Sequence, residues 1–275
     1  MIPSSAESPP DRHALYELCV QSTKHVVPFL KAVHGGSPRV LGEDFAGTAA
    51  LSHRWVREVE AGRAIAVDVD AEALAYRGRH DRVETIAADV RACGAPADVA
   101  FVGNFSIGYH HTRADLVEYL RHVRSRLNPS GVFVCDTYGG ESAFLTGEVH
   151  RDHFIAGEDL PPSLAPHRGK RVRYTWEQRD ADPVTGMVTD VCHFRLIDTG
   201  GTIVLELPDA FVYRWRLWSI PELRDALTEA GFSGVDVYSK TADAVDQDGN
   251  VYIRPIENGD DELDDSFIVL IAGRA

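Results

Sequence analysis

Two short apolar runs that each end in acidic residues constrain this chain more than any other feature. The first covers residues 40–42 and leads through Glu43-Asp44 into the small-residue turn at 45–50. The second covers residues 64–67, one helical pattern later, and ends in Asp68. In an α/β sheet, such a turn lets backbone N–H groups approach a nucleoside, and the second carboxylate binds ribose hydroxyls. The pattern therefore predicts a nucleoside site at the carboxyl ends of two parallel strands.

The rest of the chain continues the alternation of strands and helices. Strands are expected at 39–42, 64–69, 83–87, 98–105 and 132–136, and helices at 48–60, 71–79 and 113–127. Two helices or one are expected within 13–34, another helix from Ser219 to Ala230, and final strands at 235–239 and 267–272, the last antiparallel. This order predicts a doubly wound, mostly parallel seven-stranded sheet of the Rossmann-like α/β class.

A β-rich segment interrupts the alternation. Residues 171–179, 188–197 and 202–215 carry strand patterns separated by turn residues, which predicts an antiparallel three-stranded meander. We therefore expect a disordered tail at 1–12, a nucleoside-binding core with N-terminal helices at 13–140, a β insertion that covers the substrate at 141–218, and a return to the core sheet at 219–275.

Charge and cysteine spacing limit the partners. The formal net charge is -14, which disfavours a nucleic-acid partner. Arg121, Arg124 and Arg126 fit a solvated helix face. The four cysteines form no CxxC pair, so a disulfide scaffold is not expected and a cytoplasmic location fits. No apolar run reaches the ~20 residues of a membrane span, so no membrane partner is expected. A homodimer is left open.

The ordered motifs resemble those of class I S-adenosyl-L-methionine (SAM)-dependent methyltransferases. The resemblance covers residues 39–136 and resumes at Ser219. It consists of the acidic turn at 43–49, the carboxylate of Asp68, an acidic residue after the third strand at Asp89, and the fourth strand at 98–106. The approach to the fifth strand at 128–133 and the helix at 223–232 also look like this family.

The resemblance implies a cofactor-binding role for ten residues. Glu43 would face the methionine ammonium of SAM, with Ala46 and Gly47 lining the turn. Asp68, followed by Val69, would bind the ribose hydroxyls. Further along, Asp89 would accept from the adenine amino group, the Val90 N–H would donate to the ring, Phe105 and Ser106 would lie beside the sulfonium, and Tyr16 would cover the methionine carboxylate.

Structural explanations for the same residues stay open. Glu43 and Asp44 also fit as caps of the next helix, and Asp68 and Asp89 as carboxylates that close loops. Tyr16 fits equally well as a tyrosine at the edge of a core.

The turn departs from the family pattern (D/E)xGxGxG. Phe45 stands at the first glycine and Ala49 at the third, so Gly47 alone remains. Gly47 is the position where the backbone passes closest to a ligand. A nicotinamide dehydrogenase would need GxGxxG directly after the first strand, and Phe45 at the leading glycine disfavours that alternative.

Candidate catalytic residues follow the fourth and fifth strands. Tyr109, His110 and His111 precede a helix, and Tyr138 follows the fifth strand. A histidine titrates near neutrality and suits a general base, which a hydroxyl acceptor requires. The alternatives are a surface histidine pair for His111 and a simple turn around Tyr138.

A calcium-loop pattern is incomplete. Residues 246–257 place oxygens at several ligand positions, but Val251 replaces the glycine and Pro255 intrudes. We expect an acidic hairpin and no metal.

The leading hypothesis is a SAM-dependent methyltransferase that transfers a methyl group in line to an N or O atom of a small-molecule acceptor and releases S-adenosyl-L-homocysteine (SAH). The first alternative is a SAM- or nucleotide-binding module without methyl transfer. The second, less favoured, is an NAD-dependent oxidoreductase.

Overall fold

The computed structural model describes residues 10–21, 23–157, 160–247, 251–257 and 263–275. The chain divides into two compact units, each of which is described by itself. We call them the sheet unit (the described part of Met1–Ser22, with Leu145–Ala181 and Val188–Arg214) and the core unit (Thr23–Phe144, Asp182–Met187 and Trp215–Ala275). Residues 1–9 of the expected tail lie outside the described residues, and helix α1 already begins at Arg12, capped by the side chain of Asp11.

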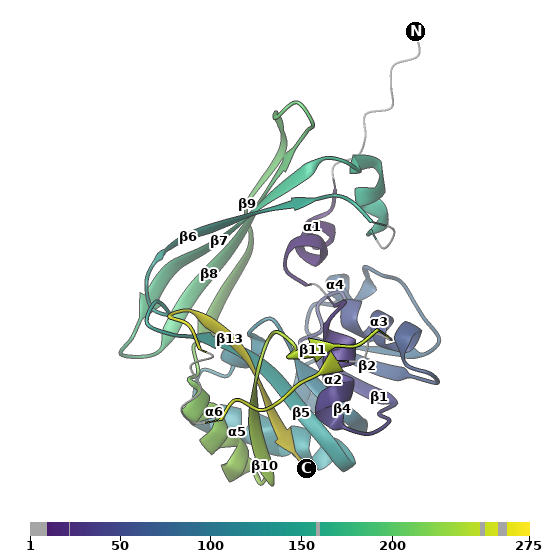
Figure 1. Cartoon of the computed structure of the whole chain (residues 1–275), viewed down its shortest axis with the longest axis vertical. Coiled ribbons are helices and arrows are strands. Elements are labelled where there is room, and N and C mark those ends of the chain that lie inside the picture. Colours follow the sequence, from purple (N-terminus) through teal and green to yellow (C-terminus); the bar gives the residue numbers. More distant parts are fainter. Residues whose placement is uncertain (1–9, 22, 158–159, 248–250, 258–262) are drawn as a thin grey trace. The chain divides into compact units, whose positions relative to one another are not determined.

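The core unit contains the expected seven-stranded sheet (Figure 1). Its strand order is β10-β13-β5-β4-β1-β2-β3, and β13 is antiparallel to both of its neighbours. The strands are β1 (Val40–Asp44), β2 (Arg63–Asp68), β3 (Val83–Ala87), β4 (Ala97–Val102), β5 (Leu127–Gly139), β10 (Gly234–Ser239) and β13 (Phe267–Arg274). The register pairs Asp44 with Val67 and with Val102, so the carboxyl ends of β1, β2 and β4 lie along one edge.

Helices cover both faces of this sheet. Leu116 and Leu120 of α5 and Leu223 and Leu227 of α6 belong to one buried apolar cluster. Residues of α2 and α3, Trp55 among them, belong to another. The helices are α2 (Val26–His34), α3 (Ala50–Glu58), α4 (Ala71–Ala75), α5 (Arg113–Arg126) and α6 (Ile220–Ala230).

Capping residues fix the ends of α5 and α6. Thr112 caps α5, and Ser219 forms a capping box with Glu222 at the start of α6. Gly231 ends α6 with a left-handed backbone, where a glycine costs no Cβ clash. The expected helix at 71–79 is shorter than predicted, because α4 ends at Ala75.

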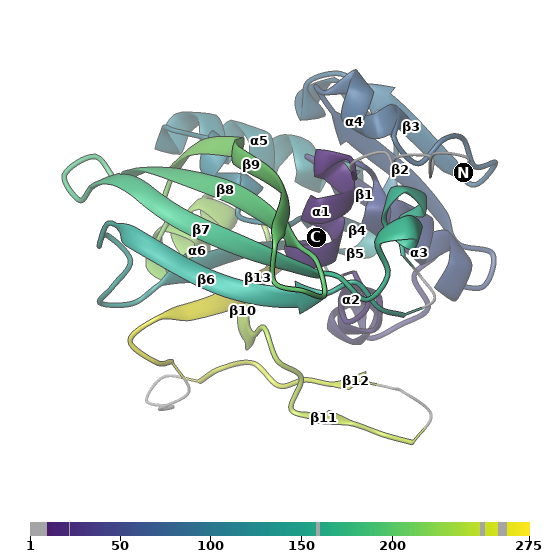
Figure 2. The ribbon, with the colours of Figure 1, turned by 90° about the horizontal axis from the view of Figure 1, so that it is seen from above.

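The sheet unit holds four strands where three were expected (Figure 2). Their order is β6-β7-β8-β9, and β6 pairs antiparallel with β7. The prediction missed β6, whose sequence GEVHRDHF is mostly polar and exposed and so lacks the alternation that marks a half-buried strand. The strands are β6 (Gly147–Phe154), β7 (Arg171–Asp182), β8 (Met187–Ile197) and β9 (Ile203–Arg216).

Helix α1 (Arg12–Cys19) also belongs to the sheet unit, although its sequence position suggested the core. The short helix η3 (Pro162–His167) completes that unit. In the core unit, β11 (Ala244–Val245) and β12 (Val251–Tyr252) form a small hairpin. Among the described residues, no helix is both long and apolar enough to cross a bilayer.

Candidate functional site

One hydrogen bond joins the two acidic segments with which the sequence singled out a site. Asp68, at the end of β2, accepts the backbone N–H of Gly47 at 2.7 Å. Its other carboxylate oxygen accepts from the Asp70 N–H at 2.9 Å. The turn after β1 is further tied to β2 by the Ala46 N–H, which donates to the Val67 carbonyl. The predicted turn and the predicted carboxylate therefore lie together at one edge of the sheet.

The turn keeps a glycine-like backbone despite its two replaced glycines. Phe45, Gly47 and Ala49 all have φ between 54° and 56°. Such a left-handed conformation costs a residue with a Cβ on the order of 1–3 kcal/mol, so the surrounding structure must hold it. Among the described residues, apart from Gly47 and its two chain neighbours, no heavy atom lies within 4 Å of the point where a Cβ on Gly47 would stand. The turn therefore leaves open space beside its one remaining glycine.

Glu43 is buried behind this turn. One of its carboxylate oxygens accepts from the Ser52 N–H at 2.8 Å and from the Ser52 hydroxyl at 2.6 Å, in the first turn of α3. Burial raises the pKa of Glu43 from 4.5 to about 7. Glu43 thus caps α3, as the structural explanation proposed, and its contact with a ligand ammonium stays a prediction.

Asp44, the neighbour of Glu43, turns to the other side. It accepts from the Tyr119 hydroxyl and the Arg126 guanidinium, both on α5. The solvated face predicted for Arg126 is wrong, because its side chain is only 2% exposed. The buried carboxylate attracts the last arginine of the helix inward.

At the end of β3, Asp89 caps the short helix η1 (Val90–Ala92). Its carboxylate also receives two hydrogen bonds from the Arg91 guanidinium, which lower its pKa to about 2. Val90 is buried, whereas Val69, just after Asp68, is 75% exposed. The exposed valine and the ionised Asp89 provide an apolar and an anionic surface at the ends of β2 and β3.

Asp136, near the carboxyl end of β5, organises the turn that follows β4. Its two carboxylate oxygens accept from the N–H groups of Asn104 and Phe105, at 3.0 and 2.7 Å. Both of these residues have positive φ, and Ser106 after them is buried. Burial raises the pKa of Asp136 to about 6. The sequence reasoning missed this role; its one signal was an acidic residue at a strand end.

The ring of His110 is buried and is fixed by two neighbours. Its Nδ1 lies 2.8 Å from Asp115, and its ring stacks on Tyr119 with centroids 4.4 Å apart. Burial lowers the pKa of His110, although Asp115 opposes this. With Nδ1–H donated to Asp115, Nε2 carries the lone pair, and this buried atom has no hydrogen-bond partner among the described residues. The arrangement is that of a base held in one tautomer.

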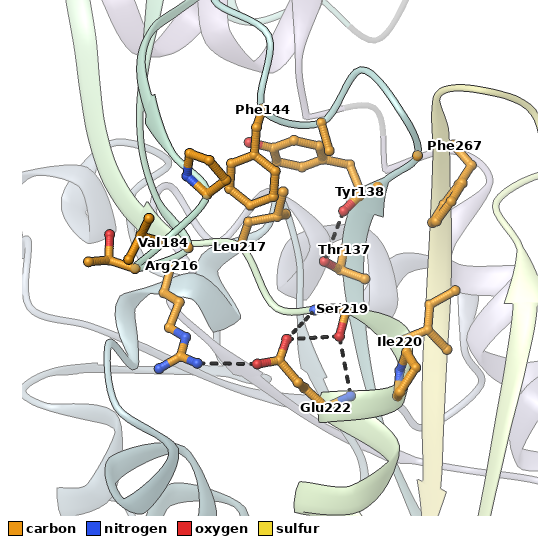
Figure 3. Close-up of a pocket in the computed structure, with 17 residues that line it drawn as sticks. Thr137, Tyr138, Phe144, Val184, Arg216, Leu217, Ser219, Ile220, Glu222 and Phe267 are labelled. Carbon is orange, nitrogen blue, oxygen red and sulfur yellow. Dashed lines mark hydrogen bonds and ion pairs between the residues drawn. The ribbon is translucent and has the colours of Figure 1, made fainter.

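Tyr109 and Tyr138 lie near the same strand ends. The ring of Tyr109 stacks on that of Phe45, with ring centroids 5.7 Å apart, and Tyr109 remains 43% exposed. Tyr138 contacts Phe105 edge to face at 4.9 Å and lines a cavity (Figure 3). His111 is exposed, and its carbonyl accepts from Arg216.

Tyr16 belongs to the sheet unit, where its ring packs against Phe211 at 4.8 Å. That packing agrees with a tyrosine in a core edge. Its expected contact with the methionine carboxylate stays a prediction.

Among the described residues, Glu177, His193 and Asp209 gather potential metal ligands in the sheet unit. Arg179 already pairs with both carboxylates. The Asp209 N–H donates to Nδ1 of His193, so Nε2 of a neutral ring carries the proton, which faces Glu177. A metal bound between these residues would need the lone pair of Nε2, and that nitrogen carries the proton. The cluster therefore fits an ion-pair network better. Part of the calcium-loop pattern, residues 248–250, lies outside the described residues.

No family model and no curated protein match this chain. Solved structures do. A SAM-dependent methyltransferase from Clostridium acetobutylicum matches with a TM-score of 0.64 and 14% identity, over 95% of this chain and 96% of that one.

Two sugar-modifying enzymes match similarly. The sugar N-methyltransferase KedS8 from Streptoalloteichus has a TM-score of 0.62 and 17% identity, over 100% and 96% of the two chains. SAM-bound CalS10, an amino pentose methyltransferase from Micromonospora echinaspora, has a TM-score of 0.59 and 15% identity, over 93% of this chain and 91% of that one. The chain therefore has the fold of these SAM-dependent methyltransferases.

Proposed function

We propose that this protein is a SAM-dependent methyltransferase that transfers a methyl group to an N or O atom of a small-molecule acceptor. The observation that carries the proposal is the hydrogen bond from the Gly47 N–H to Asp68 at the converging ends of β1 and β2. This bond joins the glycine turn to the carboxylate that would bind the ribose hydroxyls, in a fold that SAM-dependent methyltransferases share.

The residues at this edge fit an adenosyl group. Asp68 is within reach of solvent and can exchange its backbone bonds for ribose hydroxyls, and the space beside Gly47 is open. Val69 offers an apolar surface to a purine, while Asp89 and the Val90 N–H would meet its polar edge. Ala46 and Gly47 would line the methionine part, and Glu43 would meet its ammonium.

SAM supplies a methyl group already activated by its sulfonium. The chain must then align the acceptor and exclude water, which is catalysis by proximity and orientation. Phe105, whose N–H donates to Asp136, and Ser106, whose N–H donates to the Gly103 carbonyl, would border the reacting region. Nε2 of His110 would take the proton of a hydroxyl acceptor, and Tyr109 and Tyr138 would help to position the acceptor.

The names of two structural neighbours suggest where to look for an acceptor. KedS8 is a sugar N-methyltransferase and CalS10 an amino pentose methyltransferase. An amino sugar is therefore the first acceptor to test, with its hydroxyl analogue beside it. We further propose that residues 141–218 cover the substrate and that the protein acts in the cytoplasm, with no nucleic-acid partner because of its net charge of -14.

Calorimetric titration with SAM, SAH and NAD tests the proposal. We expect saturable binding of SAM and SAH and none of NAD. Affinity for NAD without affinity for SAM would replace the proposal with the oxidoreductase. Methyl transfer to a panel of amino sugars and their hydroxyl analogues comes next. Tight SAM binding with no turnover of any acceptor would favour the binding module.

A further inference from the structure

A cavity of about 430 Å³ lies in the core unit, between the end of β5, the start of α6 and the turn at 182–187 (Figure 3). Its volume is in the range of small-molecule sites, roughly 300–1,000 Å³. None of the cofactor residues proposed above lines it. Tyr138 does, and it is the ring that also contacts Phe105.

The polar side chains of the cavity already have partners. Ser219 and Glu222 bind each other in the capping box of α6. The Arg216 guanidinium pairs with Glu222 at 3.2 Å and lies 3.8 Å from the centre of the Trp218 ring. The Thr137 hydroxyl donates to the Trp218 carbonyl. Among the described lining residues, the one cation and the one anion pair with each other, so these residues present no uncompensated charge to a ligand.

The apolar part of the wall includes three aromatic rings. The rings of Phe144 and Tyr138 lie at one end of the cavity in Figure 3, and Phe267 lies along one side. Phe267 packs where Gly139 has no side chain, since a Cβ there would stand 2.6 Å from the ring. Leu217 and Ile220 add aliphatic surface. Such faces favour rings stacked or set edge to face.

The wall opposite β5 is fixed by the backbone. The Leu217 N–H donates to the Gly186 carbonyl at 2.8 Å, and the Gly186 N–H donates to the Asp182 carbonyl at 2.8 Å. These bonds hold the turn at 182–187 against residues 216–217. A wall fixed in this way reduces the entropy lost on binding.

From these walls we infer that the cavity beside β5 is a binding site for an uncharged small molecule that carries an apolar ring. The inference is independent of the proposed methyl transfer, because it depends only on the volume, the paired polar groups and the aromatic faces of this cavity.

Fluorescence titration with N-phenyl-1-naphthylamine, an uncharged probe with aromatic rings, tests it. We expect saturable binding of one probe molecule per chain, with or without saturating SAH. Leu217→Trp fills the cavity and should weaken binding at least tenfold. Val184 also lines the cavity, but its side chain is exposed. Val184→Trp therefore gives a second variant that adds a large ring at the cavity without a change in the core packing. Val245→Trp is the matched control, because Val245 is exposed and outside the cavity.

Each result decides the inference. Loss of probe binding in Leu217→Trp and Val184→Trp, with wild-type affinity in Val245→Trp, supports it. No saturable binding, equal binding by all variants, or displacement of the probe by SAH overturns it. Circular dichroism of each variant identifies loss of fold. SAH calorimetry on the same samples reports on the proposed function separately.

Discussion

Asp44 and Arg126 form an ion pair in which the two side chains are 1% and 2% exposed. The pair joins the end of β1 to the end of α5, directly behind the turn that contains Gly47. Gly42 makes room for it, since a Cβ there would stand 2.7 Å from an Arg126 guanidinium nitrogen. A charge buried at this depth is costly once its partner is removed.

Asp44→Ala should therefore lower the free energy of unfolding by about 3–5 kcal/mol. Replacing both members, Asp44→Leu with Arg126→Leu, should recover most of this loss because no buried charge remains. Denaturant unfolding measures both. Glu206→Ala, which breaks the exposed pair with Arg195, is the control and should cost about 0–1 kcal/mol. An equal loss in Asp44→Ala and in the control would contradict the argument.

Glu43 should make stability depend on pH. Its pKa is raised by burial from 4.5 to about 7, so the folded chain holds a proton there that the unfolded chain releases. The resulting stabilisation is full below about pH 4.5 and is lost as the pH rises through about 7. Between about pH 5 and 8, the free energy of unfolding of the wild type should fall by about 2–3 kcal/mol relative to that of Glu43→Gln, because the amide of the variant does not titrate. Parallel stability curves for the two proteins would exclude this assignment.

Asp68→Ala should weaken the binding of SAH by about 1–3 kcal/mol, the cost of leaving buried hydroxyls without their acceptor. Isothermal calorimetry gives the dissociation constant. Asp225→Ala, an exposed carboxylate on α6, is the control and should bind as wild type does. Because Asp68 also accepts from Gly47 and Asp70, a thermal melt must accompany each titration. An unchanged dissociation constant would remove Asp68 from the site.

Asp136→Asn should loosen the end of β4. An amide offers one acceptor where the carboxylate accepts from two N–H groups, so either Asn104 or Phe105 loses its partner. Both have positive φ, and the strain then has less to oppose it. Hydrogen exchange at these two amides should accelerate at least tenfold, while Ala100 within β4 stays protected. Unchanged exchange at both amides would show that the carboxylate does not hold this turn.

The fold could be predicted because its signals are local. Strands β1 and β2 are short apolar runs that end in Asp44 and Asp68, and helix α6 begins at the cap Ser219. Strand β6 could not be predicted, since nearly all of its residues are exposed. Its sequence therefore shows no alternation of apolar and polar residues.

The site could be predicted only in part, for a related reason. The Asp68–Gly47 bond could be predicted because β1 and β2 follow each other in the sequence and pair in the sheet, so their carboxyl ends lie side by side. The role of Asp136 depends on which strand lies beside β5, and the inward turn of Arg126 depends on the carboxylate of Asp44, far away in the sequence. Such partners become visible only when the sheet order is known.

The sheet unit takes its residues from the beginning and from two later stretches of the chain. On the ribosome, α1 therefore emerges long before the strands with which it is grouped, and it must wait for them while the first core strands are made. No single cut by a protease, and no simple truncation, would release this unit as one continuous fragment, so its stability has to be measured in the full-length protein.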